Sequence, residues 1–249
     1  MTTATLDGKV ALVTGAGRNI GRAIALALAR AGAQVAVNVR ASRDEGRAVV
    51  DEIAALGGAA LLVQADVTQR AQVDAMLGAV IRRFGRLDIL VNNAAVRDEA
   101  DFAGISYAHW RAAFDVTVDG AFHCTQAAFE WLCKSPAGSV VNIGGMTAST
   151  GAAGRAHVVA AKAAVAGLTR ALAHEFAPYG VTVNCVSPGM IDTARANAAP
   201  RHHASHRPLL DRRGHPDEVA AAVVWLAGEG GRFTTGQTLH INGGAYLGI

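Results

Sequence analysis

Short apolar runs rich in β-branched residues alternate along the chain with longer stretches in which apolar residues recur at helical spacing. The short runs predict buried strands, and the longer stretches predict amphipathic helices that cover them. Strands alternating with helices indicate a parallel sheet with both faces covered, and right-handed crossovers make that sheet doubly wound. We expect strands at 9–16, 33–40, 60–67, 87–95, 138–145, 181–189 and 238–244, and helices at 19–33, 43–57, 69–84, 109–133, 157–178 and 216–228.

No linker, low-complexity run or shift in composition divides the 249 residues, of which 51% are hydrophobic. We therefore expect one α/β domain of the Rossmann type spanning residues 1–249. The chain has no run of 18 uncharged apolar residues and no secretory signal pattern, so neither a membrane span nor export is expected. Three cysteines without metal-like spacing favour a reducing cytoplasm. The net charge of +3 is dispersed, which argues against nucleic acid as a partner.

The segment TGAGRNIG at 14–21 joins the first expected strand to the first helix. Glycines at such a turn let the backbone approach a pyrophosphate, whose charge is attracted to the helix N-terminus. Asn19 stands where a third glycine would be expected, and asparagine tolerates left-handed backbone angles better than most residues. An ordinary strand-to-helix turn is the alternative, but the place after the first strand of an alternating chain favours phosphate binding.

The end of the second expected strand indicates which dinucleotide is bound. An acidic residue there would bind a ribose 2′-hydroxyl, whereas an arginine would accept a 2′-phosphate. The sequence VAVNVRAS has no acid, and it places Arg40 and Ser42 just beyond the strand, with Arg18 in the glycine-rich turn. These residues favour NADP(H) over NAD, although the arginines alone are also compatible with ordinary surface charges.

Further motifs follow the later strands. Asp66-Val67 stands where an adenine contact is found, NNAA at 92–95 resembles NNAG, and SPGMIDT at 187–193 resembles PGxxxT. With TGAGRNIG and the C-terminal GQTLHINGG, these motifs make the chain resemble the short-chain dehydrogenase/reductase family almost from end to end. It looks most similar to the 3-oxoacyl-[acyl-carrier-protein] reductases within that family.

The resemblance implies a set of cofactor contacts. Asn93 and Ala94 would lie along the cofactor, and the Ile191 backbone and the Thr193 hydroxyl would meet the nicotinamide amide. Lys162 would hold the hydroxyls of the nicotinamide ribose. The full set of expected cofactor-binding residues is Gly15, Arg18, Asn19, Ile20, Gly21, Arg40, Ser42, Asp66, Val67, Asn93, Ala94, Lys162, Pro188, Gly189, Ile191 and Thr193.

The catalytic set that the resemblance implies is Asn, Ser, Tyr and Lys, and only the lysine is kept, as Lys162. Val158 takes the place of the tyrosine four residues earlier, Gly145 that of the serine, and Thr117 that of the asparagine. Reduction of a carbonyl needs a proton and hydrogen-bond donors for the developing alkoxide. Loss of such a donor typically costs about a hundredfold or more in rate. The residues for binding the cofactor are therefore kept, whereas those for ordinary ketone reduction are not.

Other side chains nearby are candidates for the missing donor. His157 has a suitable pKa range, but neighbours on a helix point about 100° apart, so it should aim away from the nicotinamide unless the helix begins irregularly. Thr147 and Ser149 offer hydroxyls, which are not acidic. Tyr107 is expected on the substrate side or in a structural role. The candidate catalytic residues are Lys162, His157, Thr147 and Thr117.

The segment RHHASHRP at 201–208 lies in an expected substrate lid near 194–212. No acid closely flanks its three histidines, whereas zinc sites of the helical kind have one beside them. We therefore favour a solvated or substrate-facing loop and expect no metal.

The sequence thus predicts an NADP(H)-dependent oxidoreductase with altered proton delivery, acting on a carbonyl or on an activated C=C bond of a small 3-oxoacyl- or enoyl-like molecule. A non-enzymatic NADP-binding sensor or assembly protein and a non-redox lyase or isomerase are the alternatives. The resemblance also implies a homotetramer, in which the helices near 109–133 and 157–178 form the main contact.

Overall fold

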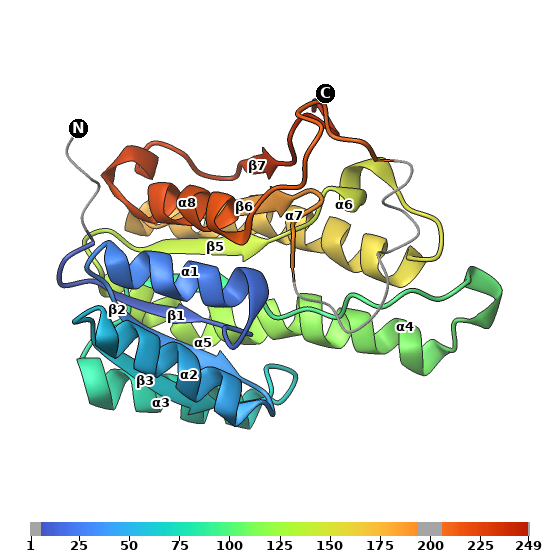
Figure 1. Ribbon diagram of the computed structural model, residues 1–249. Helices are drawn as coiled ribbons and strands as arrows, with labels where there is room; N and C mark the ends of the chain where they lie inside the picture. The colour runs from blue at the N-terminus through green and yellow to red at the C-terminus, as the bar shows by residue number, and fades with distance from the viewer. Residues whose placement is uncertain (1–5, 194–205, 249) are drawn as a thin grey trace.

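A computed structural model describes residues 6–193 and 206–248 and confirms the doubly wound α/β architecture (Figure 1). All strand pairs are parallel, and the seven strands are ordered β3-β2-β1-β4-β5-β6-β7. The order reverses between β1 and β4, where such sheets bind ligands. The strands are β1 (Val10–Val13), β2 (Gln34–Val39), β3 (Ala60–Gln64), β4 (Ile89–Asn92), β5 (Ser139–Ile143), β6 (Thr182–Pro188) and β7 (Thr238–Ile241).

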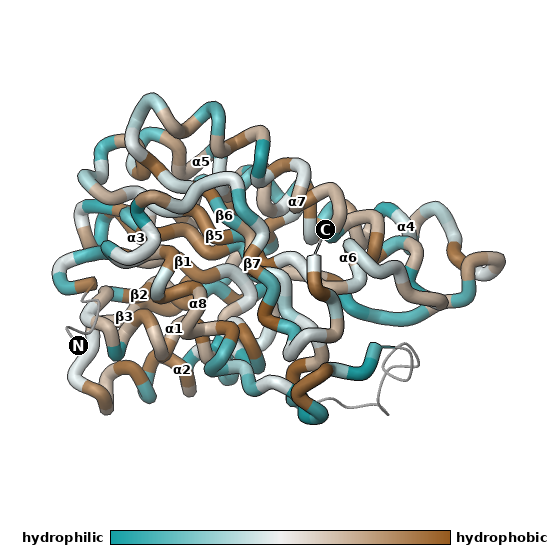
Figure 2. Tube along the Cα trace, turned by 90° about the horizontal axis from the view of Figure 1, so that it is seen from above, coloured by the Kyte–Doolittle hydropathy of each residue, from teal (hydrophilic) through white to brown (hydrophobic). Residues whose placement is uncertain are grey.

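Helices cover both faces of the sheet. One buried cluster joins the strands to α1, α2 and α8, and a second joins them to α3, α5 and α7. Hydrophobic residues accordingly run along the strands in the middle of the molecule (Figure 2). The helices are α1 (Asn19–Arg30), α2 (Arg43–Ala55), α3 (Arg70–Phe84), α4 (Tyr107–Phe114), α5 (Gly120–Lys134), α6 (Thr147–Thr150), α7 (Ala156–Phe176) and α8 (Pro216–Ala227).

Strand β1 illustrates why the apolar runs are uninterrupted. Ala11 and Val13 belong to the cluster on one face, and Val10 and Leu12 to the cluster on the other. A strand that is buried on both faces has no solvent side on which polar residues could alternate.

The expected helix at 109–133 differs from the structure. Helical geometry runs from α4 to α5 but is interrupted by a π-helical turn at Asp115–Asp119, which contains Thr117. A π turn accommodates an extra residue and changes the register of the side chains that follow. The short helix α6 was not predicted. In the expected lid, residues 194–205 lie outside the described residues, and 206–212 form neither helix nor strand.

Buried amides tie α7 to the sheet. The Asn92 side-chain nitrogen on β4 donates to the Asn142 side-chain oxygen on β5 at 2.9 Å. The Asn142 nitrogen in turn donates to the Thr169 hydroxyl on α7 at 2.9 Å. Because buried polar groups without partners are costly, this chain of bonds specifies where α7 lies over the strands.

A second set of bonds holds the glycine-rich turn against β4. The Thr14 hydroxyl accepts the backbone N–H of Asn93 at 2.9 Å and that of Ala94 at 3.1 Å. The Asn93 amide nitrogen donates to the carbonyl oxygens of Thr14 and Gly15 at 2.9 and 3.0 Å. The first turn of α1 lies so close that a Cβ on Gly21 would be 2.3 Å from the Gly15 oxygen. Only glycine fits there.

We predict that Gly21→Ala lowers the free energy of unfolding by roughly 1–3 kcal/mol, because the methyl group must push α1 away from β4. Chemical denaturation measures this loss. Gly78→Ala on α3 is the matched control, since a Cβ there meets only the flexible end of Arg82, at 3.3 Å. The control should be neutral or stabilise by up to about 1 kcal/mol through helix propensity. Equal losses in both variants would contradict the tight approach.

Candidate functional site

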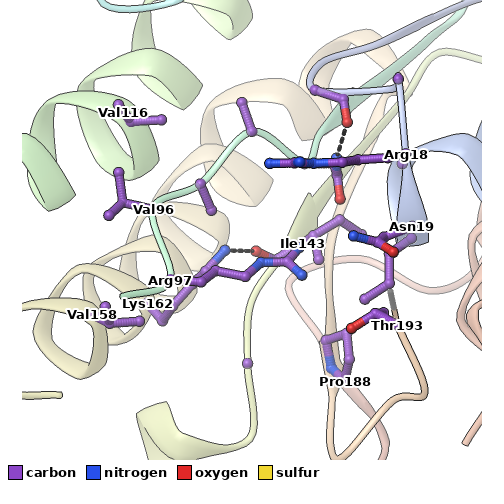
Figure 3. A pocket seen from close by; sticks show the side chains of 18 of the residues that line it. Arg18, Asn19, Val96, Arg97, Val116, Ile143, Val158, Lys162, Pro188 and Thr193 are labelled. Carbon is purple, nitrogen blue, oxygen red and sulfur yellow. Dashed lines mark hydrogen bonds between the residues drawn. The ribbon is translucent and has the colours of Figure 1, made fainter. Parts of the chain in front are cut away.

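A cleft of about 850 Å³ opens beyond the carboxyl ends of the strands, at the reversal of strand order (Figure 3). The structure brings every residue of the expected cofactor-binding set to the wall of this one cleft. Their contact with a cofactor stays a prediction. The residues concerned are Gly15, Arg18, Asn19, Ile20, Gly21, Arg40, Ser42, Asp66, Val67, Asn93, Ala94, Lys162, Pro188, Gly189, Ile191 and Thr193.

The glycine-rich turn has the geometry that a phosphate requires. Gly15 has φ of 61° and Asn19 has φ of 51°, so the asparagine does adopt the left-handed conformation. Helix α1 begins without a side-chain cap and has no acid in its first turn. Its first residues line the cleft, so the positive end of its dipole lies at the cleft wall.

Arg18, Arg40 and Ser42 line the end of the cleft at which the sequence predicts a 2′-phosphate. Glu45, which the sequence analysis did not single out, also lines this end and lies 3.9 Å from the Arg18 guanidinium. Both side chains are substantially exposed, so this ion pair contributes little stability and gives little resistance to a phosphate.

Asn38 is another residue that the sequence analysis missed. It is buried on β2, and its side-chain oxygen accepts the Gly15 N–H at 3.3 Å while its nitrogen donates to the Ala65 carbonyl at 3.1 Å. It thereby links the glycine-rich turn to the segment that follows β3. The single polar residue within the apolar run VAVNV was the signal that could have revealed it.

Asp66 is held in its turn by local bonds. Its carboxylate accepts the backbone N–H and the hydroxyl of Thr68 at 3.0 and 2.8 Å. On the other side of the cleft, Gly189 donates its N–H to the Ile241 carbonyl at 2.9 Å, and Ile191 forms a parallel bridge with Gly214. Side-chain bonds therefore hold the Asp66 turn, and backbone bonds hold the segment at Gly189 and Ile191.

Lys162 lies at the inner end of the cleft, where its ammonium donates to the Ile143 carbonyl (Figure 3). Burial is the main cause that lowers the pKa of Lys162 from 10.5 to about 7. The positive charges of Arg97 and Arg155 lower this pKa further, against an opposing effect of Cys185. A lysine in this state exchanges its proton near neutral pH.

Comparison with known proteins agrees with this geometry. A protein-family profile described as Enoyl-(Acyl carrier protein) reductase matches residues 15–246. The 3-oxoacyl-[acyl-carrier-protein] reductase FabG of Staphylococcus aureus is 38% identical over 242 residues, which are 96% of this chain and 98% of the relative. The 3-oxoacyl-[acyl-carrier-protein] reductase of Synechocystis is 40% identical over 243 residues, 97% and 98% of the two chains.

Solved structures give the same result. A short chain dehydrogenase from Burkholderia cenocepacia, crystallised in complex with NADP, superimposes with a TM-score of 0.91 at 38% identity, over 96% of this chain and 98% of that one. The chain belongs to the short-chain dehydrogenase/reductase family. A blue fluorescent protein from a metagenomic library, in complex with NADPH, has a TM-score of 0.90 at 34% identity, over 98% and 100% of the two chains.

Gly145 and Val158, the two positions to which the sequence resemblance assigns the family's serine and tyrosine, both line the cleft. Val158 lies one turn before Lys162 on α7 and is buried. A Cβ placed on Gly145 would meet only the Lys162 side chain, at 3.8 Å. There is room for a hydroxyl side chain at Gly145, but neither residue donates a proton from its side chain.

The other candidate catalytic residues are placed differently. Thr147 begins α6 and lines the cleft, whereas Thr117 is buried in the π-helical turn and His157 is fully buried, and neither of these two lines the cleft. The 100° offset from Val158 thus turns His157 away, as expected from the helix. The structure gives no support to a direct catalytic role for His157 or Thr117.

His157 instead shares a carboxylate with a second histidine. Its Nε2 donates to one oxygen of Asp98 at 3.2 Å, and His109 Nε2 donates to the other at 2.5 Å. Burial alone would raise the pKa of Asp98, but the hydrogen bonds from His157 and His109 lower it overall. This bridge fastens the segment after β4 to the beginnings of α4 and α7. Sequence spacing gave no sign of it, because the three residues are far apart in the chain.

We predict that Lys162→Met stabilises the chain more at about pH 6 than at about pH 9. Because the pKa of Lys162 is about 7 in the folded chain and 10.5 ordinarily, the cost of burying its charge is complete below about pH 7 and falls as pH rises toward 10.5. The gain in Tm should be larger at pH 6 by roughly 5 °C. Lys134→Met, on the exposed surface of α5, should show no such dependence. An equal gain at both pH values would contradict the burial of a charged ammonium.

Proposed function

We propose that this member of the short-chain dehydrogenase/reductase family uses NADP(H) to reduce a carbonyl or an activated C=C bond in a small 3-oxoacyl- or enoyl-like substrate, without a serine–tyrosine donor pair. One observation carries the proposal: every residue of the expected cofactor-binding set lines one cleft, beside a buried lysine. The names of the family profile and of the relatives support an oxidoreductase, and they include both enoyl and 3-oxoacyl reductases.

The residues that would hold the dinucleotide follow the length of the cleft. The N–H groups at the start of α1 would bind the pyrophosphate, while Arg18, Arg40 and Ser42 would bind a 2′-phosphate. Lys162 would hold the nicotinamide ribose. NADP(H), when bound, supplies the hydride. The NADP and NADPH present in two similar structures support this choice of cofactor over NAD.

Proton delivery falls to the groups that remain at the inner end of the cleft. The Lys162 ammonium lies there with a pKa of about 7, so at neutral pH it can hold a proton and release it to a developing anion. Thr147 adds a hydroxyl on the same wall. A C=C substrate would reduce the demand further, because its proton can come from solvent.

A homotetramer in the cytoplasm is part of the proposal. The apolar stretch Ala156–Tyr179, which contains α7, has the length and composition of a membrane span. One side of α7 packs into the core beside the sheet. Only 39% of the most apolar part of the stretch is buried, so much of its other side is uncovered in a single copy. A second copy of α7 would cover the rest. The free cysteines Cys124, Cys133 and Cys185 favour a reducing compartment.

The cofactor preference can be tested with Arg40→Ala. Removing one guanidinium from a charge-assisted bond to the 2′-phosphate should weaken NADPH binding by about 10- to 100-fold and change NADH binding little. Fluorescence titration measures both affinities. Arg43→Ala, at the exposed start of α2 and outside the cleft, is the matched control. Equal weakening of both cofactors by Arg40→Ala would remove its assignment to the 2′-phosphate.

NADPH oxidation with a panel of 3-oxoacyl, enoyl and small ketone substrates tests the activity. We expect consumption with at least one class, and we expect the double variant Gly145→Ser/Val158→Tyr to raise ketone reduction by about a hundredfold, since it restores the donors. The single variant Gly145→Ser, which restores no acid, is the control. Tight NADPH binding without turnover by either form would instead indicate a sensor or assembly protein.

A further inference from the structure

Asp98, His109 and His157 form a cluster in which one carboxylate and two imidazoles converge. The Nε2 atom of His109 lies 2.5 Å from one oxygen of Asp98, and that of His157 lies 3.2 Å from the other. The centroids of the two rings are 4.5 Å apart. One nitrogen from each ring and one carboxylate oxygen all lie within 4.8 Å of one another. Three groups of the kind that bind metals therefore meet from three separate segments of the chain.

The spacing of these three atoms is close to what a single ion requires. Zinc binds imidazole nitrogen and carboxylate oxygen at about 2.0–2.2 Å, so neighbouring ligand atoms of a tetrahedral site lie roughly 3.4 Å apart. The three atoms of the cluster already lie within 4.8 Å of one another. Side-chain rotation can close the remaining difference, because the side chain of Asp98 is 49% exposed and that of His109 is 29% exposed.

The backbone around the cluster is already fixed. The Ala100 N–H donates to the Gly154 carbonyl at 2.9 Å, which joins the segment after β4 to the loop before α7. The His109 N–H donates to the hydroxyl of Ser106, which caps α4, at 3.1 Å. His157 lies in the first turn of α7 and is fully buried. Ligands that are held in place in advance lose little conformational freedom when an ion binds.

The ligand types indicate the class of ion. Imidazole suits Zn²⁺ and the neighbouring divalent transition metals, whereas Mg²⁺ and Ca²⁺ are bound by oxygen ligands. Two imidazoles and one carboxylate are a ligand set of zinc sites that keep a fourth position for water. Here His157 closes the inner side of the cluster, while Asp98 and His109 are partly exposed. The fourth position would face outward, and the same opening gives the ion a path of entry.

The unpaired nitrogen of His157 is compatible with an ion. Its Nδ1 is buried and has no hydrogen-bond partner within the described part of the chain. When Nε2 donates to Asp98, Nδ1 is an unpaired acceptor, and when Nε2 binds a metal, the proton moves to Nδ1, which becomes an unpaired donor. The number of buried atoms without a partner is therefore the same in both forms.

We infer that Asp98, His109 and His157 form a binding site for a divalent transition metal of the Zn²⁺ class. This inference goes beyond the proposed function and does not depend on it. The expectation of no metal rested on the histidines at 201–208, whereas this cluster uses other residues. Of its three members only Asp98 lines the cleft. The ion would therefore lie behind the cleft wall, where it fastens the segment after β4 to α4 and α7.

Calorimetry with ZnCl₂ tests the site on the full chain, without an affinity tag and after treatment with a chelator. We expect one equivalent of Zn²⁺ per chain to depend on the cluster. Asp98→Asn and His109→Gln should each lower its affinity by at least about 100-fold, because loss of a group that only supports a ligand already costs about 10- to 100-fold. Co²⁺ is the second probe, and its visible absorption should show nitrogen ligands in the unchanged protein but not in the two variants. His157 is left in place because it belongs to the interior.

Two variants outside the cluster are the matched controls. His174→Gln removes an exposed histidine near the end of α7, and Asp74→Asn removes an exposed aspartate on α3. Both should bind Zn²⁺ as the unchanged protein does. Zn²⁺ at about 100 times its Kd should raise Tm by about 5 °C in the unchanged protein and in both controls, but not in the cluster variants. A cooperative melt without metal shows that each variant is folded.

Absence of Zn²⁺ binding, or binding that persists in Asp98→Asn and His109→Gln, would overturn the site. Equal losses in the two control variants would also overturn it, since they would indicate adsorption to surface side chains. Binding of Mg²⁺ in preference to Zn²⁺ would contradict the class of ion. None of these measurements uses NADPH or a substrate, so the metal site and the proposed reduction can fail separately.

Discussion

The close approach of α1 to β4 is the contact on which the site depends. Thr14 and Asn93 take part in four hydrogen bonds that join the segment after β1 to the segment after β4. At Gly21, in the first turn of α1, there is no room for a side chain. These bonds fix the uncapped N-terminus of α1 relative to the wall that carries Ala94. A helix dipole is useful for binding an anion only if its end is held at the right distance. The position of the glycine-rich turn is therefore set by β4 as much as by its own glycines.

The two halves of the cleft differ in the kind of interaction that forms them. The cofactor half depends on backbone groups and tight packing, so it tolerates Asn19 in place of glycine because the required φ is still reached. The substrate half depends on side-chain charge. There Gly145 and Val158 line the wall, and burial, together with the charges of Arg97 and Arg155, lowers the pKa of Lys162. An electrostatic arrangement of this kind is strong in a buried site and weak in water.

The fold and the cofactor half could be predicted from the sequence because both depend on local patterns. Buried strands are uninterrupted apolar runs, and the residues that follow them must meet at one edge of the sheet. Long-range contacts could not be predicted in this way. The bridge from His157 through Asp98 to His109 joins segments with no common spacing, and Arg155 precedes a helix whose direction the pattern does not give. The π-helical turn was missed because a single extra residue shifts the phase of the apolar positions once, while the helical period on either side of it stays the same.

That turn gives the chain an unusual sensitivity to insertion and deletion. One extra residue in a helix rotates everything beyond it by about 100° relative to an uninterrupted helix. The π turn at Asp115–Asp119 thus sets the rotation of α4 relative to α5. Helix α5 is anchored in the core, and α4 carries His109 toward Asp98. Deletion of a single residue here would leave α5 in place but rotate His109 away from Asp98. The segment bearing Arg97 would then lose one of its two fastenings, without any change in the residues that line the cleft.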